Sequence, residues 1–197
     1  DTGAALGGTV FFQSTADGPG AITVTAGTGN FDVTGAIGAV TPLASLTVTS
    51  AANATFGADV TTVGVQDVTA TTINTNGTHA TTDSDIDLNG AVVLQAATAL
   101  STGAGAGDIT VTGTINGAQT LDLTAGTGSI DLQSAVGGGT ALTSLTVNSA
   151  ADVDLDAVTA GTVTQLAGTG TTTVNGVMTA NTGDILITTD RIVQNAD

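Results

Sequence analysis

The side chains that could perform chemistry in this chain are few, and almost all of them are carboxylates. All 17 acidic residues are Asp, the only Lys or Arg is Arg191, the only imidazole is His79, and Cys is absent. Disulfides and thiolate metal sites are therefore excluded. A catalytic triad would have to use His79, but no Gly-x-Ser-x-Gly motif accompanies it. A single His in the turn-like stretch 76–79 is predicted to be a solvated loop residue, and we expect no enzyme activity.

Calcium is the metal candidate that these carboxylates suggest, because Asp supplies hard oxygen ligands. Asp recurs at alternate positions in two places, Asp83/Asp85/Asp87 and Asp152/Asp154/Asp156. In a strand, residues i and i+2 share a face, so the second row points outward if Val153 and Leu155 point inward. Such a row is typical of a solvated face that repels neighbouring molecules. Calcium-loop motifs are absent. We therefore expect no cofactor; if calcium binds, Asp152, Asp154 and Asp156 are its candidate ligands.

The charge balance excludes several classes of partner. The formal net charge is −16, whereas nucleic-acid binding relies on Lys and Arg to contact phosphates. The same charge disfavours anionic membrane surfaces. No apolar run in the sequence is long enough to span a bilayer as a helix. We expect neither a nucleic-acid partner nor membrane insertion.

An internal duplication organises the chain. Residues 22–56 align with residues 121–155 without a gap, at an offset of 99 (121 − 22). The phrase Ala-Gly-Thr-Gly occurs at 26–29 and 125–128, and Ser-Leu-Thr-Val occurs at 45–48 and 144–147. Fixed-period similarity of this kind is typical of repeat architectures. We expect one elongated unit over residues 1–197.

Alternation of apolar and polar residues predicts the elements that carry these side chains. Ile22-Thr23-Val24 and Leu46-Thr47-Val48 have the period of two that marks a half-buried strand. Similar stretches of three to five residues recur along the chain, separated by Gly-, Asn- or Asp-rich turns that include four Asn-Gly pairs. Only four aromatic residues, all Phe, are present, which favours a narrow aliphatic core. The fold class is therefore all-β: a β-solenoid with coils of roughly 20–25 residues, or alternatively a tandem β-sandwich.

The repeated phrase resembles a known type. Residues 22–49 and 121–148, with a partial copy at 166–177, resemble the Thr/Gly/Asp-rich β-strand repeats of very large bacterial surface or secreted adhesins, similar in style to filamentous haemagglutinin. The resemblance covers most of residues 21–190. It implies a right-handed parallel β-helix, export to the cell surface or beyond, and a role as stalk, adhesin or matrix. It implies no catalytic residues. Such relatives are giant chains, so this one is expected to be a segment or an end-to-end subunit.

The two ends of a solenoid are its unpaired edges, and we expect function there. Apolar residues concentrate near both ends of the chain, at Val10, Phe11, Phe12, Ile185, Leu186, Ile187, Ile192 and Val193. We expect head-to-tail self-association through them, giving an extracellular or cell-surface filament. Alternatively, the Phe pair plugs the core at one end. A second function class is an adhesin module that binds glycan or a host surface, although no Trp or Tyr is present to stack on sugars.

Overall fold

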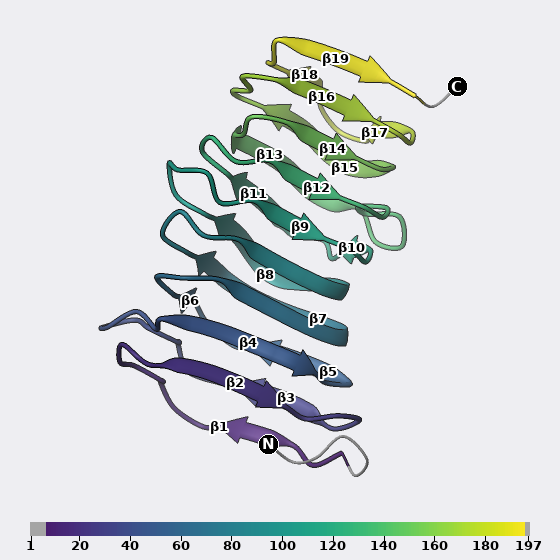
Figure 1. Ribbon diagram of the computed structural model, residues 1–197. Helices are drawn as coiled ribbons and strands as arrows, with labels where there is room; N and C mark the ends of the chain where they lie inside the picture. Colours follow the sequence, from purple (N-terminus) through teal and green to yellow (C-terminus); the bar gives the residue numbers. More distant parts are fainter. Residues whose placement is uncertain (1–6, 196–197) are drawn as a thin grey trace.

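The computed structural model describes residues 7–195, which form a single stacked rod of parallel strands without a helix. Every strand pairing within these residues is parallel, which excludes the tandem sandwich and confirms the β-solenoid, with about nine turns. Figure 1 shows the coils stacked in sequence order, with β1 at one end of the rod and β19 at the other. Since residues 7–195 hold no helix, none of them forms a helix that could span a membrane.

Each coil passes through three ladders of parallel strands, which we call faces 1, 2 and 3. Face 1 consists of β2 (Ala21–Thr25), β4 (Ser45–Ser50), the start of β7 (Gln66–Ala80), the start of β8 (Ile86–Ser101), β9 (Ile109–Val111), β12 (Ile130–Leu132), β14 (Val153–Leu155), β16 (Thr171–Val174) and β19 (Arg191–Gln194).

Face 2 consists of β1 (Val10–Phe12), β3 (Asn30–Val33), β5 (Asn53–Phe56), the middle of β7 and of β8, β10 (Ile115–Asn116), a bridge at Val136, the start of β15 (Val158–Gln165) and β17 (Met178–Ala180). Face 3 consists of bridges at Ala16 and Ile37, β6 (Val60–Thr61), the ends of β7 and β8, β11 (Thr120–Thr124), β13 (Leu142–Ser149), the end of β15 and β18 (Ile185–Ile187).

The coil length follows from one ladder. Along face 2, the positions that stack on one another run from Val10 to Met178 in eight steps. The mean coil is therefore (178 − 10)/8, or about 21 residues, which lies within the usual range of solenoid repeats and agrees with the sequence prediction. Along most strands the alternate residues point inward, and the interior is a column made mainly of Val, Ile, Leu, Ala and Phe side chains, with some buried Thr, Gln and His side chains among them.

The duplicated sequence does not return to the same face. Ile22 lies on face 1, but its counterpart Leu121 lies on face 3. Phe31 lies on face 2, whereas its counterpart Ile130 lies on face 1. The cause is arithmetic, because the offset of 99 divided by the mean coil length gives about 4.7 coils, close to four and two-thirds. The second copy is therefore displaced around the rod by one face.

Local geometry is nevertheless the same in both copies. Gly38 and its counterpart Gly137 have φ angles of 68° and 72°, a left-handed conformation that favours glycine. A Cβ at Gly38 would lie 2.1 Å from the Thr61 carbonyl oxygen of the next coil, so these corners also need the missing side chain. Both β2 and β11 shift register at the equivalent place in their pairing with the next coil. The faces are thus interchangeable environments for one sequence.

Candidate functional site at the two ends of the rod

The C-terminal coil leaves inward-pointing side chains uncovered. Ile185 stacks on Val163, and Ile192 stacks on Thr172. Val163 is only 3% exposed, but Ile185 is 43% and Ile192 is 56% exposed. Within residues 7–195, β18 pairs only with β15 and β19 pairs only with β16. The exposure follows from position, because these side chains belong to the interior column and lack a described coil above them.

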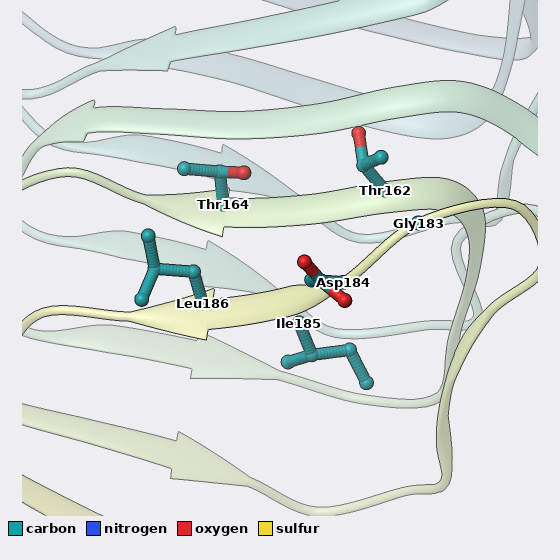
Figure 2. Close-up of a pocket in the computed structure, with 6 residues that line it drawn as sticks. All are labelled: Thr162, Thr164, Gly183, Asp184, Ile185 and Leu186. Carbon is teal, nitrogen blue, oxygen red and sulfur yellow. The ribbon is translucent and has the colours of Figure 1, made fainter.

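Leu186 is exposed for a different reason. It points to the outside of the rod and stacks on the outward Thr164. Figure 2 shows Leu186 and Ile185 on opposite sides of β18, with Leu186 beside the hydroxyl-bearing side chains of β15. A shallow groove runs here, lined by Thr162, Thr164, Gly183, Asp184, Ile185 and Leu186. Leu186 is 57% exposed, so an apolar side chain stands on the outer surface of the last coil.

The N-terminal coil divides its two Phe residues between inside and outside. Phe12 packs edge-on against Phe31, with ring centroids 5.5 Å apart, and Val10 also packs on the core. Phe11 points outward and is 49% exposed. Among the described residues β1 pairs only with β3. Phe12 therefore covers the core at this end, as the plug alternative expected, and Phe11 does not.

The remaining predicted end residues are only partly exposed. Ile187 stacks on the buried Gln165, and Val193 stacks on the outward Thr173. The eight predicted residues thus fall into two groups on the terminal coils, the first at β1 and the second at β18 and β19. The rod separates these two groups, so a single molecule does not bring them together (Figure 1).

The Asp residues have structural partners that the sequence did not reveal. The Asp152 carboxylate accepts a hydrogen bond from the Thr171 backbone N–H at 2.7 Å, and the Asp154 carboxylate accepts one from the Asn175 amide. Asp83 and Asp85 accept from backbone N–H groups of the following coil at 2.6 and 2.9 Å. Short Asp side chains at corners therefore tie successive coils together. Asp152, Asp154 and Asp156 point outward, and no three His, Asp, Glu or Cys groups in residues 7–195 converge to hold a metal.

A further row of carboxylates is close enough to interact. Asp67 and Asp87 stack on face 1 and are flanked by Asp85 and Asp108. Burial raises the pKa of Asp87, and the three neighbouring carboxylates raise it further, against a hydrogen bond from Thr110. Rows of this kind would repel each other if two rods lay side by side.

The prediction of a solvated His79 was wrong. The side chain is fully buried in β7, in the interior column, with its ring edge-on to Phe56 at 5.0 Å. Gln66 Nε2 donates to the Ala80 carbonyl at 2.8 Å, so Gln66 Oε1 must accept, and His79 Nδ1 donates to it at 3.0 Å. His79 Nε2 then carries a lone pair without a hydrogen-bond donor among residues 7–195. Burial lowers the pKa of His79 to about 4, against the opposing charge of Asp59.

The buried position settles what His79 can do. A solvent-borne substrate cannot reach a side chain with no exposed surface. Sequence misplaced it because Asn76-Gly77 looked like a turn, whereas the strand β7 continues through a positive φ of 91° at Gly77. The coils on either side bury the residues that follow.

Comparisons with known proteins gave no relative. No protein-family model, no curated protein and no solved structure matches the chain. The geometry of the ends and sides of the rod is therefore the basis for inferring a function.

Proposed function

We propose that this chain is a rod-like structural unit of an extracellular or cell-surface filament, joined to its neighbours through its ends. The observation that carries the proposal is the exposure of Ile185 and Ile192, which occupy positions that are buried in the coils below them. Covering them with another parallel coil would remove apolar surface from water and pair the free strand edges.

The sides of the rod support association at the ends over association along the length. The net charge of −16 is spread over outward Asp residues, such as the stacked pair Asp131 and Asp154. Two rods lying side by side would bring these carboxylates together, which costs free energy. A coil added at an end meets mainly apolar side chains and backbone hydrogen-bonding groups.

The proposal is tested by electron microscopy and sedimentation of the purified protein over a range of concentrations and salt. About nine coils at ~4.8 Å give a rod of ~40 Å, so we expect filaments of constant width whose length grows in steps of that size. Uniform single rods under all conditions would overturn the proposal.

A matched pair of variants separates the ends from the sides. Ile192→Asp puts a charge on the exposed end of the core and should shift the population to single rods. Val63→Asp is the control, because Val63 is 53% exposed on the body of the rod, where its backbone hydrogen-bonds to Leu43 of the coil below and to Thr82 of the coil above. Equal shortening by both variants would contradict assembly through the C-terminal coil.

A further inference from the structure

The duplication continues well beyond residues 22–56 at the same offset. On the N-terminal side, Gly18 matches Gly117, with φ angles of 129° and 135°. On the C-terminal side, matches at an offset of 99 include Gln66 with Gln165, Asn76-Gly77 with Asn175-Gly176, and Asp85-Ile86 with Asp184-Ile185. The chain therefore consists of two equivalent units in tandem, and the rod contains one junction between units.

That internal junction has a defined register on face 1. The start of β8, in the first unit, pairs in parallel with β9, in the second unit. The three pairs are Ile86 with Ile109, Asp87 with Thr110, and Leu88 with Val111. Ile86, Leu88, Ile109 and Val111 point inward and are buried, while Asp87 and Thr110 point outward.

The counterparts of these two strands are the terminal strands of the rod. Moving 86–88 forward by 99 gives 185–187, which is β18, and moving 109–111 back by 99 gives 10–12, which is β1. β18, at the C-terminal end, is thus the counterpart of the strand through which the first unit pairs with the second. Within residues 7–195, no strand pairs with its outer edge. β1, at the N-terminal end, is the counterpart of β9, the strand through which the second unit pairs with the first.

The geometry points to a specific partner and register: β18 of one molecule pairs in parallel with β1 of a second copy of this chain, with Ile185 opposite Val10, Leu186 opposite Phe11 and Ile187 opposite Phe12. This inference rests on the proposed end-to-end assembly and adds its register. Ile185 and Val10 keep the apolar, inward character of Ile86 and Ile109, so the interior column continues across the interface.

The outward pair provides independent support. In the internal junction this position holds Asp87 and Thr110, which hydrogen-bond to each other, as polar residues on an outer surface are expected to do. At the ends both positions have become apolar, to Leu186 at 57% and Phe11 at 49% exposure. The register was fixed by the repeat, without reference to these two side chains, and it places them next to each other at ~4.8 Å backbone spacing. An apolar pair in contact across an interface accounts for both exposures.

The same stacking uses the single cation of the chain. Ala16 is the counterpart of Ile115, which stacks on Val92. At an offset of 99, Val92 corresponds to the outward Arg191 and not to the inward Ile192, so this face needs a shift of one residue from the register of the repeat for Ile192 to face Ala16 of the second copy. Arg191 and Asp17 would then lie diagonally across the two strands, on the outer surface, within reach of a guanidinium side chain. An acidic rod thus carries its only Arg at the end that meets Asp17.

The proposed arrangement turns the second copy by one face. β18 lies on face 3 and β1 on face 2, so the copies join with the same displacement that relates the two units within the chain. Stacking without this turn would instead continue face 2 directly, with Met178 opposite Val10 and Thr179 opposite Phe11. The two registers differ in which outward residue meets Phe11.

Disulfide trapping distinguishes them, because the chain has no Cys of its own. Leu186→Cys and Phe11→Cys are made as separate proteins, one with a mass tag, then mixed and oxidised under mild conditions. Backbones ~4.8 Å apart are within the range that a disulfide spans. We expect a mixed disulfide dimer at least ~10-fold more abundant than the dimer from the control mixture of Thr179→Cys with Phe11→Cys. All three sites are on strand surfaces, and circular dichroism confirms that each variant is folded.

A charge exchange gives a second readout that does not need Cys. Leu186→Asp should abolish filaments, and an equimolar mixture with Phe11→Lys should restore filaments in which charge-paired junctions alternate with unchanged Leu186–Phe11 junctions; high salt should break these filaments into paired rods. Filaments of the unchanged protein together with trapping only through Thr179, or with no trapping through either site, overturn the register and leave the proposed function standing. Absence of filaments and of trapping overturns both.

Discussion

The two units share a backbone path but fill it differently. In the first unit, Phe12, Phe31, Phe56 and His79 form an edge-to-face ladder through the core, with centroid distances of 5.5, 5.8 and 5.0 Å. At an offset of 99, the second unit has Val111, Ile130, Leu155 and Met178 in their places. The aromatic ladder thus has an entirely aliphatic counterpart on a different face.

What stays constant between the units is the corners. Gly27 and Gly126 have φ angles of 63° and 59°, and each donates its backbone N–H to a Ser hydroxyl of the next coil, at 3.3 and 3.2 Å. The contrast teaches that turn chemistry and spacing specify the coil, while the interior accepts any apolar set of suitable total volume. The unit with the aromatic ladder has less freedom, because its rings contact one another across four coils.

The largest difference between the units should appear on truncating the ladder. Phe31 is fully buried between two other rings, so Phe31→Ala should lower the free energy of unfolding by about 4 kcal/mol, through lost burial and the cavity left behind. Ile130→Ala, its counterpart, should cost about 3 kcal/mol. Denaturant unfolding measures both.

Phe31→Ile is the matched control, since it imports the residue that the second unit has at this place. It should cost about 1 kcal/mol if the two cores are interchangeable. A loss as large as that of the Ala variant would show that the aromatic ladder is required and would break the comparison.

The next effect depends on pH and comes from His79. Its pKa in the fold, about 4, lies below the unfolded value of 6.5, so the neutral ring stabilises the fold fully above pH 6.5. That contribution is lost as pH falls from 6.5 to 4, and the shift corresponds to about 3 kcal/mol. Unfolding free energies measured across this range should fall accordingly.

His79→Met sharpens the comparison by giving the first unit the Met178 of the second. The substitution should remove both the loss of folding stability that His79 causes at low pH and the unsatisfied Nε2 atom, so that only the carboxylates still titrate. Protonation of Asp87, whose pKa is raised, acts in the opposite direction and favours the fold at low pH. Identical pH profiles for the original and the Met variant would show that His79 does not titrate in this way.

The smallest effect concerns equivalent corners. Asp17 accepts hydrogen bonds from the Val40 and Thr41 backbone N–H groups, and Asn116 accepts from Gly139 and Thr140, which are their counterparts. Asp17→Ala and Asn116→Ala should each cost about 1 kcal/mol, as loss of a side-chain cap does. Thermal unfolding of both variants tests whether the corners contribute equally. A clear difference between the two would mean that a corner depends on its position in the rod.

Much of the fold followed from local sequence, because alternation and corner glycines act within a few residues. Ile22, Val24, Leu46 and Val48 point toward the core as their alternation predicts. The strands were expected to be short, but β7 and β8 run for 15 and 16 residues around corners at which Asn-Gly was taken as a break. Burial of His79 and the shift of face between the units were missed, since both depend on which residues of the neighbouring coils stack on them. Coil lengths vary too much for a local pattern to fix that stacking.

The mismatch between unit length and coil length has a mechanical consequence for any filament of such units. Since one unit spans about four and two-thirds coils, three units in succession must pass before a side chain repeats on the same face. A surface residue of one unit and its counterparts in the next two units therefore point in three different directions around the rod. Because each face of a unit occupies all three directions in successive units, differences in stiffness between the faces are averaged along the filament. Such a filament would have no preferred plane of bending and would resist flow equally from every side.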